Sequence, residues 1–348
     1  MKDLKHLIYF ENLLDNANNE LVRKAQEEGM LALGYTCYHM PEVLLNVDNC
    51  FSVRMRAPNT GSVDVASYYM SNYTCEYCRA LLERAIEGGY NFLDGLCGVD
   101  ACAQMNRCME NIELLKCVDK PNFFVTHADI PYKYTDYTLD HYVVQMQNRV
   151  LNTMHEKLGV DVSDEALREA VARHNEVCRV MTEISELRKL DNPPITGYEF
   201  HIINMVSYCC PQKLILPYLQ ETLEEIKARE PDPKPWYRCR VGIVGSEVDD
   251  PNLTRMLEEA GAFICFDRFC FGMFPGREVI ELNDEEPALR QICRHYLITS
   301  ECPRFMSNEK IEQRRVTADR LAREYNADGI IYENVKFCDF WGFERALA

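Results

Sequence analysis

Residues 72–108 read NYTCEYCRALLERAIEGGYNFLDGLCGVDACAQMNRC, which predicts a helix, a strand and a second helix, with a cysteine in the first turn of each helix. Thr74 can cap the first helix, so Cys75 takes its opening position, and the Gly-Gly pair at 88–89 ends it. Residues 90–93 then predict a short buried strand. This alternation of helix and strand is typical of a parallel sheet.

The second helix of this stretch follows Asp100, which can cap it, and its first turn holds Cys102. Thiols at helix N-termini ionise easily, and thiolates are the form of cysteine that binds metal. Open α/β sheets bind ligands in the crevice at the carboxyl ends of their strands. We therefore expect Cys75 and Cys102 to face one crevice at neighbouring strand ends.

The composition is that of a globular protein without a broad basic surface. The 348 residues are 47% hydrophobic and 27% charged, and their net charge is -17. That charge argues against broad nucleic-acid binding, because the phosphate backbone favours clustered Lys and Arg. The first residues, MKDLKH, lack the apolar core of a signal peptide, and no run is long enough to cross a bilayer. We expect a cytoplasmic protein that binds neither nucleic acid nor membrane.

Cysteine is unusually frequent, with seventeen in the chain. In the cytoplasm these should not form disulfides, and most are expected to be small apolar residues of the core. That interpretation covers the cysteines in apolar or strand-like surroundings, which are Cys209, Cys210, Cys239, Cys265 and Cys293. A minority is left to carry any metal site.

The chain before the cysteine stretch predicts a first strand and a loop with polar candidates. Residues 3–28 predict one amphipathic helix, and residues 30–35 predict the strand. In the loop that follows, Pro41 is expected to start the next helix. His39 and Glu42 are candidate site groups there, although capping or structural roles explain them equally well.

After the cysteine stretch, the pattern changes twice. Residues 51–56 and 121–127 predict two further strands of the first part, whereas residues 136–229 predict helices only. The proline-rich segment 231–235 predicts a stiff linker and a domain boundary. Beyond it, strands are expected over residues 239–246, 262–267 and 328–332, and helices over residues 252–260 and 309–325. The last part is therefore a second α/β unit.

Cys338 follows the last of these strands, which is expected to be buried, as Cys102 follows a strand of the first part. Three thiols thus lie at strand ends. Cys75 and Cys78 have the two-residue gap of a zinc pair, but no second pair follows at the spacing of a zinc finger. Spacing alone leaves open whether these thiols hold a metal.

Several segments resemble the 2-hydroxyacyl-CoA dehydratase / benzoyl-CoA reductase family over nearly the whole chain, from about residue 33 to residue 344. The segments that carry the resemblance are 73–83, 92–95, 102–107, 187–189, 193–197, 302–304, 328–331 and 336–339. The resemblance implies a heterodimer of related subunits, each with a [4Fe-4S] cluster on three cysteines. Matched residue by residue, these are Cys75, Cys102 and Cys338.

The resemblance also implies the reaction, that of an anaerobic lyase. An ATP-dependent iron–sulfur activator protein supplies one electron, an acyl-CoA thioester becomes a ketyl radical anion, and water is eliminated from a 2-hydroxyacyl-CoA to give an enoyl-CoA. Three thiolates leave one iron of the cluster open. A benzoyl-CoA-reductase-type subunit and a non-catalytic electron-relay subunit of such a complex are the alternatives. A zinc-stabilised binding protein, which would be colourless, is a further one.

The expected fold is α/β, with two Rossmann-like or flavodoxin-like parallel-sheet domains, a helical middle segment, and the cluster between the two sheet domains. The expected parts are 1–135, an α/β domain with a leading helix; 136–230, a helical domain; and 231–348, a second α/β domain. Two features depart from the family pattern: Ala103 replaces the usual Asp, and the chain stops ten residues after Cys338. The aromatic residues Phe340, Trp341 and Phe343 would be exposed in a monomer, so we expect the chain to be stable only with a partner subunit packed against them.

Overall fold

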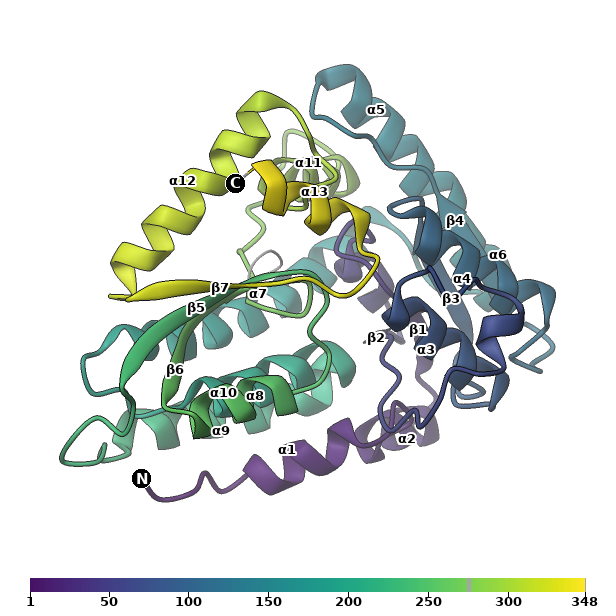
Figure 1. Ribbon diagram of the computed structural model, residues 1–348. Helices are drawn as coiled ribbons and strands as arrows, with labels where there is room; N and C mark the ends of the chain where they lie inside the picture. The colour runs from purple at the N-terminus through teal and green to yellow at the C-terminus, as the bar shows by residue number, and fades with distance from the viewer. Residues whose placement is uncertain (274–276, 348) are drawn as a thin grey trace.

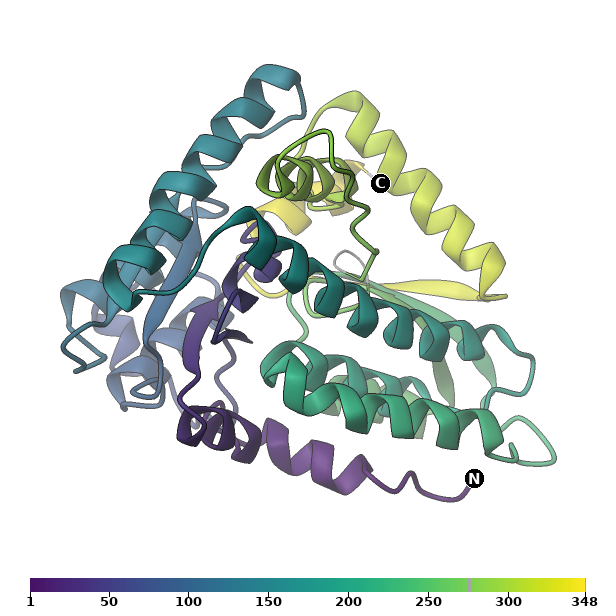
Figure 2. The ribbon, with the colours of Figure 1, turned by 180° about the vertical axis from the view of Figure 1, so that it is seen from behind.

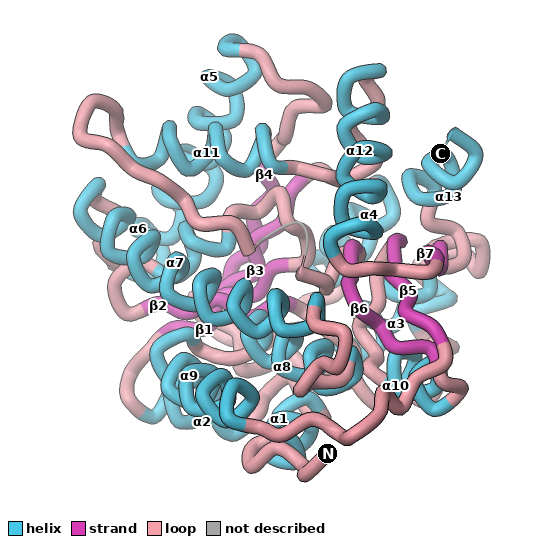
Figure 3. The backbone as a smooth tube through the Cα atoms, turned by 90° about the vertical axis from the view of Figure 1, so that its left-hand side faces the viewer, coloured by secondary structure: helices cyan, strands magenta, loops and turns pink. Residues whose placement is uncertain are grey.

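The computed structural model describes residues 1–273 and 277–347 and contains two sheets, both purely parallel. The first sheet has the order β2-β1-β3-β4 and the second the order β6-β5-β7. Figure 1 shows the two sheets on opposite sides of the molecule, and Figure 3 shows all their strands in magenta. The predicted α/β class with two parallel sheets is confirmed.

The first sheet is buried because helices and loops cover both of its faces, as in most parallel sheets. Its strands are β1 (Leu31–Tyr35), β2 (Cys50–Arg54), β3 (Gly95–Val99) and β4 (Phe124–Ala128). Every residue of β2 and β3 is buried. Gly34 of β1 has no room for a side chain, since a Cβ there would lie 2.8 Å from Cδ1 of Leu93.

The strand predicted over residues 90–93 was wrong, because these apolar residues are buried in a turn. The Leu93 N–H donates to the Tyr90 carbonyl at 3.0 Å, which closes the turn. Asp94 then joins the turn to β1: its N–H donates to the Ala32 carbonyl, and its carboxylate accepts from the Ala32 N–H, both at 2.8 Å. The strand itself begins at Gly95.

The N-terminal region forms two helices where the sequence predicted one over residues 3–28. They are α1 (Leu7–Leu14) and α2 (Glu20–Glu27). Asn19 separates them, because its side chain accepts the Val22 N–H at 3.1 Å and so caps α2. After β1, Pro41 is followed by a short 3-10 helix, η1 (Glu42–Asn46), and not by an α-helix.

The middle of the chain is helical, as predicted, and every residue from 136 to 229 is described. Its helices are α5 (Asp136–Gln145), α6 (Asn152–Leu158), α7 (Asp164–Glu186), α8 (Gly197–Cys209) and α9 (Gln212–Ala228), with the π-helical turn η3 (Met146–Leu151) joining α5 to α6. α7 and α9 run side by side, as Figure 2 shows from behind. α8 packs against β2 and β6 and is buried along almost its whole length, so it ties the two sheets together.

The second sheet is less covered than the first. Its strands are β5 (Cys239–Gly245), β6 (Ala262–Arg268) and β7 (Gly329–Glu333). Between them lie the helices α10 (Asn252–Glu259), α11 (Ala288–Thr299) and α12 (Asn308–Glu324). β7 is an edge strand whose first two residues are exposed and whose other three are half-buried. The expectation that Cys338 follows a buried strand was therefore wrong.

The last helix, α13 (Asp339–Leu347), packs back onto the second sheet. Trp341 is only 5% exposed, and the Tyr332 hydroxyl of β7 donates to its carbonyl at 2.6 Å. The expectation that a monomer exposes this tryptophan was wrong, because β7 and α12 already cover it. Phe340 is half-buried, whereas Phe343 is 59% exposed.

The division of the chain at residues 135 and 230 stays a prediction. Over residues 1–273 and 277–347, the structure contains no helix with both the length and the apolar character that a membrane span requires.

Candidate functional site

A cavity of about 140 Å³ lies where the carboxyl ends of strands from both sheets meet. A buried water needs only about 10–15 Å³ of such volume, so the cavity can hold a much larger group. Seven cysteines line it, namely Cys37, Cys75, Cys78, Cys102, Cys270, Cys302 and Cys338. The sequence predicted that Cys75, Cys102 and Cys338 would come together, and the structure brings all three to this cavity.

The topology explains why cysteines distant in sequence meet here. Cys37 lies two residues after β1, Cys270 two residues after β6, and Cys102 three residues after β3. The carboxyl ends of parallel strands lie at one edge of a sheet, and the crevice outside that edge is the usual ligand site of α/β folds. The sequence signal for Cys37 and Cys270 was therefore the same as for Cys102, and it was missed.

Cys75 is the N-cap residue of α3 (Glu76–Ile86), one position earlier than predicted. Thr74 does not cap the helix, since its hydroxyl donates to the Ser71 carbonyl at 2.6 Å. The Cys78 thiol donates to the Cys75 sulfur, and the N–H groups of Tyr77 and Cys78 face that sulfur. The bond from the Cys78 thiol contributes most, and together these donors lower the pKa of Cys75 to about 7 despite burial. The Cys75 thiol therefore ionises more easily than an ordinary cysteine.

Cys102 has the same position at the second helix, as N-cap of α4 (Ala103–Leu114). Burial raises the pKa of Cys102, although the N–H groups of Met105 and Gln104, which face its sulfur, act in the opposite direction. The predicted cap was wrong, because the Asp100 carboxylate accepts from the Asn106 side chain. Two of the predicted cysteines therefore sit at helix N-termini with N–H groups directed at their sulfurs.

Cys338 precedes α13, and its sulfur accepts from the Trp341 N–H. Burial raises its pKa to about 12, and the charges of Cys75 and Cys102 add to that rise. Its neighbour Phe337 has a φ of +71°, which L-residues rarely adopt. The three predicted thiols are thus close enough to act on one another electrostatically.

Gln104 joins the three cysteine segments, a role that the sequence did not predict. Its side-chain oxygen accepts the Cys75 N–H, and its side-chain nitrogen donates to the Phe337 carbonyl at 2.7 Å. Its own N–H points to the Cys102 sulfur. One side chain therefore holds Cys75 and the segment before Cys338 against the helix that Cys102 caps.

Within residues 1–273 and 277–347, no three His, Cys, Asp or Glu side chains converge so that they could hold a single metal ion. A cubane cluster makes a different demand, since it is bound by thiolates at separate corners. The thiols that surround this cavity come from several strand ends around it, as such a cluster requires. Cysteine is also the usual ligand of iron–sulfur clusters, and it is the most frequent residue in the lining of this cavity.

Charged residues complete the wall of the cavity. Arg268 pairs with Glu301 at 2.7 Å. Arg54, which is 3% exposed, has Glu247 at 3.7 Å, and its Nε has no hydrogen-bond partner. Burial raises the pKa of Glu247 to about 8, so this carboxyl compensates Arg54 only in part near neutral pH. An anionic group in the cavity would be stabilised by Arg54.

His39, a candidate from the sequence, lines the cavity. Its Nε2 lies 2.8 Å from the Ser300 hydroxyl, and its ring stacks on Phe305. Burial lowers its pKa to about 3, with the positive charges of Arg304 and Lys310 acting in the same direction. His39 is therefore neutral at physiological pH.

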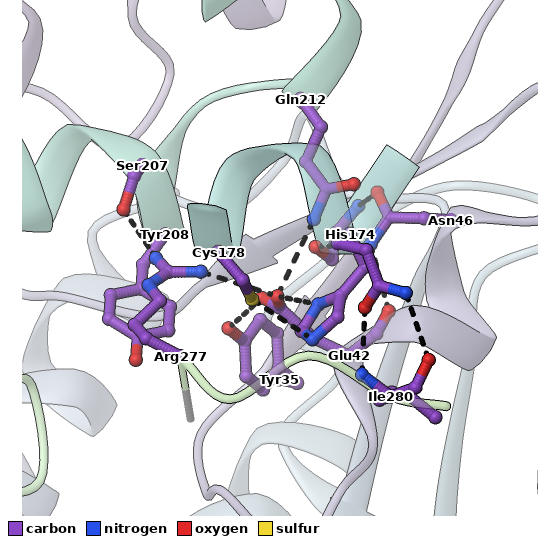
Figure 4. Close-up of polar contacts among 12 residues, drawn as sticks. Tyr35, Glu42, Asn46, His174, Cys178, Ser207, Tyr208, Gln212, Arg277 and Ile280 are labelled. Atoms are coloured by element: carbon purple, nitrogen blue, oxygen red, sulfur yellow. Dashed lines mark hydrogen bonds and ion pairs between the residues drawn. The ribbon is translucent and has the colours of Figure 1, made fainter. Parts of the chain in front are cut away.

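Glu42, the other candidate, does not line the cavity and lies in a separate buried polar cluster (Figure 4). The Tyr35 hydroxyl donates to its carboxylate at 2.8 Å, and His174 Nδ1 lies 3.1 Å from it. Gln212 and Arg277 reach the same carboxylate at 3.4 and 3.6 Å. Burial acts against ionisation, but His174 and Arg277 hold the pKa of Glu42 below its usual value. These contacts make Glu42 a structural anchor between η1, α7 and α9.

The remaining cysteines mostly follow the default for free thiols. Cys209, Cys210, Cys265 and Cys293 are buried in apolar surroundings, as predicted, and Cys239 is half-buried. Burial alone therefore does not distinguish these cysteines from the cysteines of the site. The difference is that the cysteines of the site line the cavity.

The chain is similar in sequence to several known proteins. Residues 37–348 match the family model described as 2-hydroxyglutaryl-CoA dehydratase, D-component. The chain is 25% identical over 338 residues to the (R)-phenyllactyl-CoA dehydratase beta subunit of Clostridium sporogenes, which covers 95% of this chain and 85% of that protein. It is 22% identical over 288 residues to one of the subunits of benzoyl-CoA reductase from Thauera aromatica, covering 81% of this chain and 71% of that protein.

Proposed function

The chain belongs to the 2-hydroxyglutaryl-CoA dehydratase D-component family, and from this premise we propose that it is the iron–sulfur subunit of a 2-hydroxyacyl-CoA dehydratase. The observation that carries the proposal is the meeting of Cys75, Cys102 and Cys338 at one cavity between the two sheets. The relatives point the same way, since both are named as subunits of enzymes that act on acyl-CoA thioesters. The reaction is the elimination of water from a 2-hydroxyacyl-CoA to give an enoyl-CoA.

The cofactor is a [4Fe-4S] cluster held by these three cysteines. When bound, it would supply a low-potential electron and one iron without a protein ligand, able to act as a Lewis acid. The chain's contribution is to present thiolates in a fixed arrangement. N–H groups of α3, α4 and α13 point at the three sulfurs, and hydrogen bonds to cluster sulfurs are one of the means by which proteins set the potential.

The walls of the cavity also exclude water from the cofactor. Met105, Phe269 and Trp341 are buried side chains in these walls. A dry shell around a metal site controls its potential and its solvent access. His39, neutral and held by Ser300, offers a ring at the wall that neither adds nor removes charge.

The partners follow from the same premise. They are a related second subunit, an ATP-dependent iron–sulfur activator protein and an acyl-CoA substrate, and the proposed location is the cytoplasm. A relay subunit, whose open iron never meets substrate, is distinguished from a catalytic one by a single measurement. Substrate changes the electronic spectrum of the cluster in a catalytic subunit and leaves it unchanged in a relay.

The test is anaerobic purification of the chain together with the product of a neighbouring gene, followed by a panel of acyl-CoA thioesters with activator and ATP. The expected protein is brown, carries at least about four irons per chain, and converts a 2-hydroxyacyl-CoA to its enoyl product. Reduction of an aromatic acyl-CoA thioester would show that the chain is a subunit of a reductase and not of a dehydratase. A colourless protein with one bound zinc would overturn the proposal altogether.

A further inference from the structure

Three further thiols, Cys37, Cys270 and Cys302, face the cavity but have no part in the proposed cluster site. Seven of the 22 residues that line the cavity are cysteines, compared with 17 in the 348 residues of the chain. The buried cysteines outside the cavity, such as Cys108 and Cys293, pack in the apolar core. The ordinary structural role of buried cysteine accounts for those, but it does not explain why thiols gather at one cavity.

The three extra thiols form a group of their own beside the first. Cys302 acts electrostatically on both Cys37 and Cys270 and is therefore near both thiols. Cys302 is also within electrostatic reach of Cys102, and Cys270 is within reach of Cys338. The cavity therefore has two adjoining sets of three thiols, one on the proposed ligands and one centred on Cys302.

Two thiols of the second set have backbone donors like those of the first set. The sulfur of Cys37 accepts the His39 N–H, and that of Cys302 accepts the Arg304 N–H, just as the sulfurs of the first set accept N–H groups. Backbone donors of this kind stabilise a thiolate. Two strand ends and a loop, from three different parts of the chain, supply the second set.

Positive charge is placed where the second set would need it. Arg54 acts on Cys37 and Cys270, and Arg304 acts on Cys37 and Cys302. Arg54 is 3% exposed and its Nε has no hydrogen-bond partner. A buried guanidinium with an unpartnered N–H is costly unless a negative group lies against it. The arrangement therefore calls for more negative charge at this side of the cavity than Glu247 supplies.

We propose that Cys37, Cys270 and Cys302 bind a second iron–sulfur unit, directly beside the cluster held by Cys75, Cys102 and Cys338. The inference rests on the proposed function in taking iron and sulfide as the metal chemistry of the cavity, and it requires more iron than that function does. The cofactor of this chain is then larger than one cubane. Arg54 and Arg304 offset the charge of the added thiolates.

The test counts iron and acid-labile sulfide per chain after anaerobic purification and reconstitution. The wild-type protein should carry about eight irons, and Cys302→Ala should retain about four, those of the first set. Cys293→Ala, a buried cysteine outside the cavity, is the matched control and should keep the wild-type count. Far-UV circular dichroism and the melting temperature of each variant, measured alongside, report whether it is folded.

About four irons in the wild type, unchanged by Cys302→Ala, would overturn the second unit and leave the proposed function intact. No iron in the wild type would overturn both. Equal iron loss in Cys293→Ala would assign the loss to folding and overturn Cys302 as a ligand. If the Cys302 variant does not fold, Mössbauer spectra of the wild type decide, because the iron signal must then correspond to about eight sites and not about four.

Discussion

Both sheets contribute residues to the same cavity, but their strands are buried to very different degrees. In the first sheet β2 and β3 are buried at every residue, and they lead into the segments of Cys75 and Cys102. In the second sheet β7 is half-exposed at the edge and leads to Cys338. α12, which covers β7, buries only Arg314 and Leu321 of its 17 residues. The first sheet, called the platform below, is thus held by burial along its strands. The segment of Cys338 depends instead on a few specific contacts.

The largest effect should come from the thiols themselves, and it should be equal on both sides of the cavity. Cys75→Ala, Cys102→Ala and Cys338→Ala should each lose most of the iron of the first set, because a cubane with two remaining thiolates is poorly held. Anaerobic iron analysis measures this. Cys78 lines the cavity but is a hydrogen-bond donor to Cys75, and Cys108 lies in the core. Their alanine variants should keep most of the iron, and equal loss in Cys78→Ala would show that the wrong member of the pair was chosen.

The second effect tests the weaker side. Arg314 and Glu344 form a buried ion pair with two bonds of 2.7 Å, which fixes α13 to α12. Glu344→Ala leaves the guanidinium unpaired, and such a loss costs about 3–5 kcal/mol. We expect a lower free energy of unfolding in urea and faster iron release from the folded protein.

The matched control for that experiment is Asp319→Ala, which breaks the exposed pair with Arg323 on the same helix. Exposed pairs contribute about 0–1 kcal/mol, so this variant should behave like the wild type. If Glu344→Ala is as stable as Asp319→Ala, the segment of Cys338 is held by something other than this ion pair.

The third effect concerns the platform and depends on pH. Burial opposes protonation of His174, but Cys178 and Glu42 outweigh it and raise the pKa of His174 to about 10. A histidine whose folded pKa is raised adds stability below its ordinary value of 6.5 and loses it as pH rises toward 10. The wild-type free energy of unfolding should therefore be higher at about pH 6 than at about pH 10. In His174→Gln this difference between the two pH values should be smaller, as measured by urea unfolding. His141→Gln, on an exposed helix face, should leave the wild-type difference in place.

The fourth effect tests the bridge between the two sides. Gln104→Ala removes the bonds to Cys75 and Phe337, and each hydrogen bond contributes about 0.5–1.5 kcal/mol. The iron content at equilibrium should fall little, while iron release to a chelator should become several-fold faster. Arg107→Ala, an exposed substitution one turn along α4, is the control. Unchanged release in Gln104→Ala would show that the two cysteine segments are held independently.

The elements of the platform were easier to predict from the sequence than β7 and the segment of Cys338. Alternating helices and strands predicted both parallel sheets, and helix N-termini predicted Cys75 and Cys102, because local patterns decide such elements. The buried turn at residues 90–93 was mistaken for a strand, since its apolar residues are equally buried in both conformations. Gln104 and Arg54 could not be found, as their roles depend on partners that are distant in the chain, Phe337 and Glu247. The burial of Trp341 could not be predicted either, because it depends on the packing of α13 against β7.

The smallest effect on stability should come from the exposed face of the second sheet, where a partner subunit is expected. Phe343 and Ile330 are 59% and 43% exposed, and edge strands with exposed apolar groups are natural pairing surfaces. Phe343→Asp should change the free energy of unfolding by less than about 0.5 kcal/mol, because the side chain is exposed in this chain. Its association with the partner subunit should nevertheless weaken by tenfold or more, since a charge would be buried at the interface. Sedimentation of the two chains at micromolar concentration separates the outcomes. Ile298→Asp is the control, because Ile298 on α11 is also partly exposed, at 45%. Undiminished association of the Phe343 variant would show that the partner binds at another face of this chain.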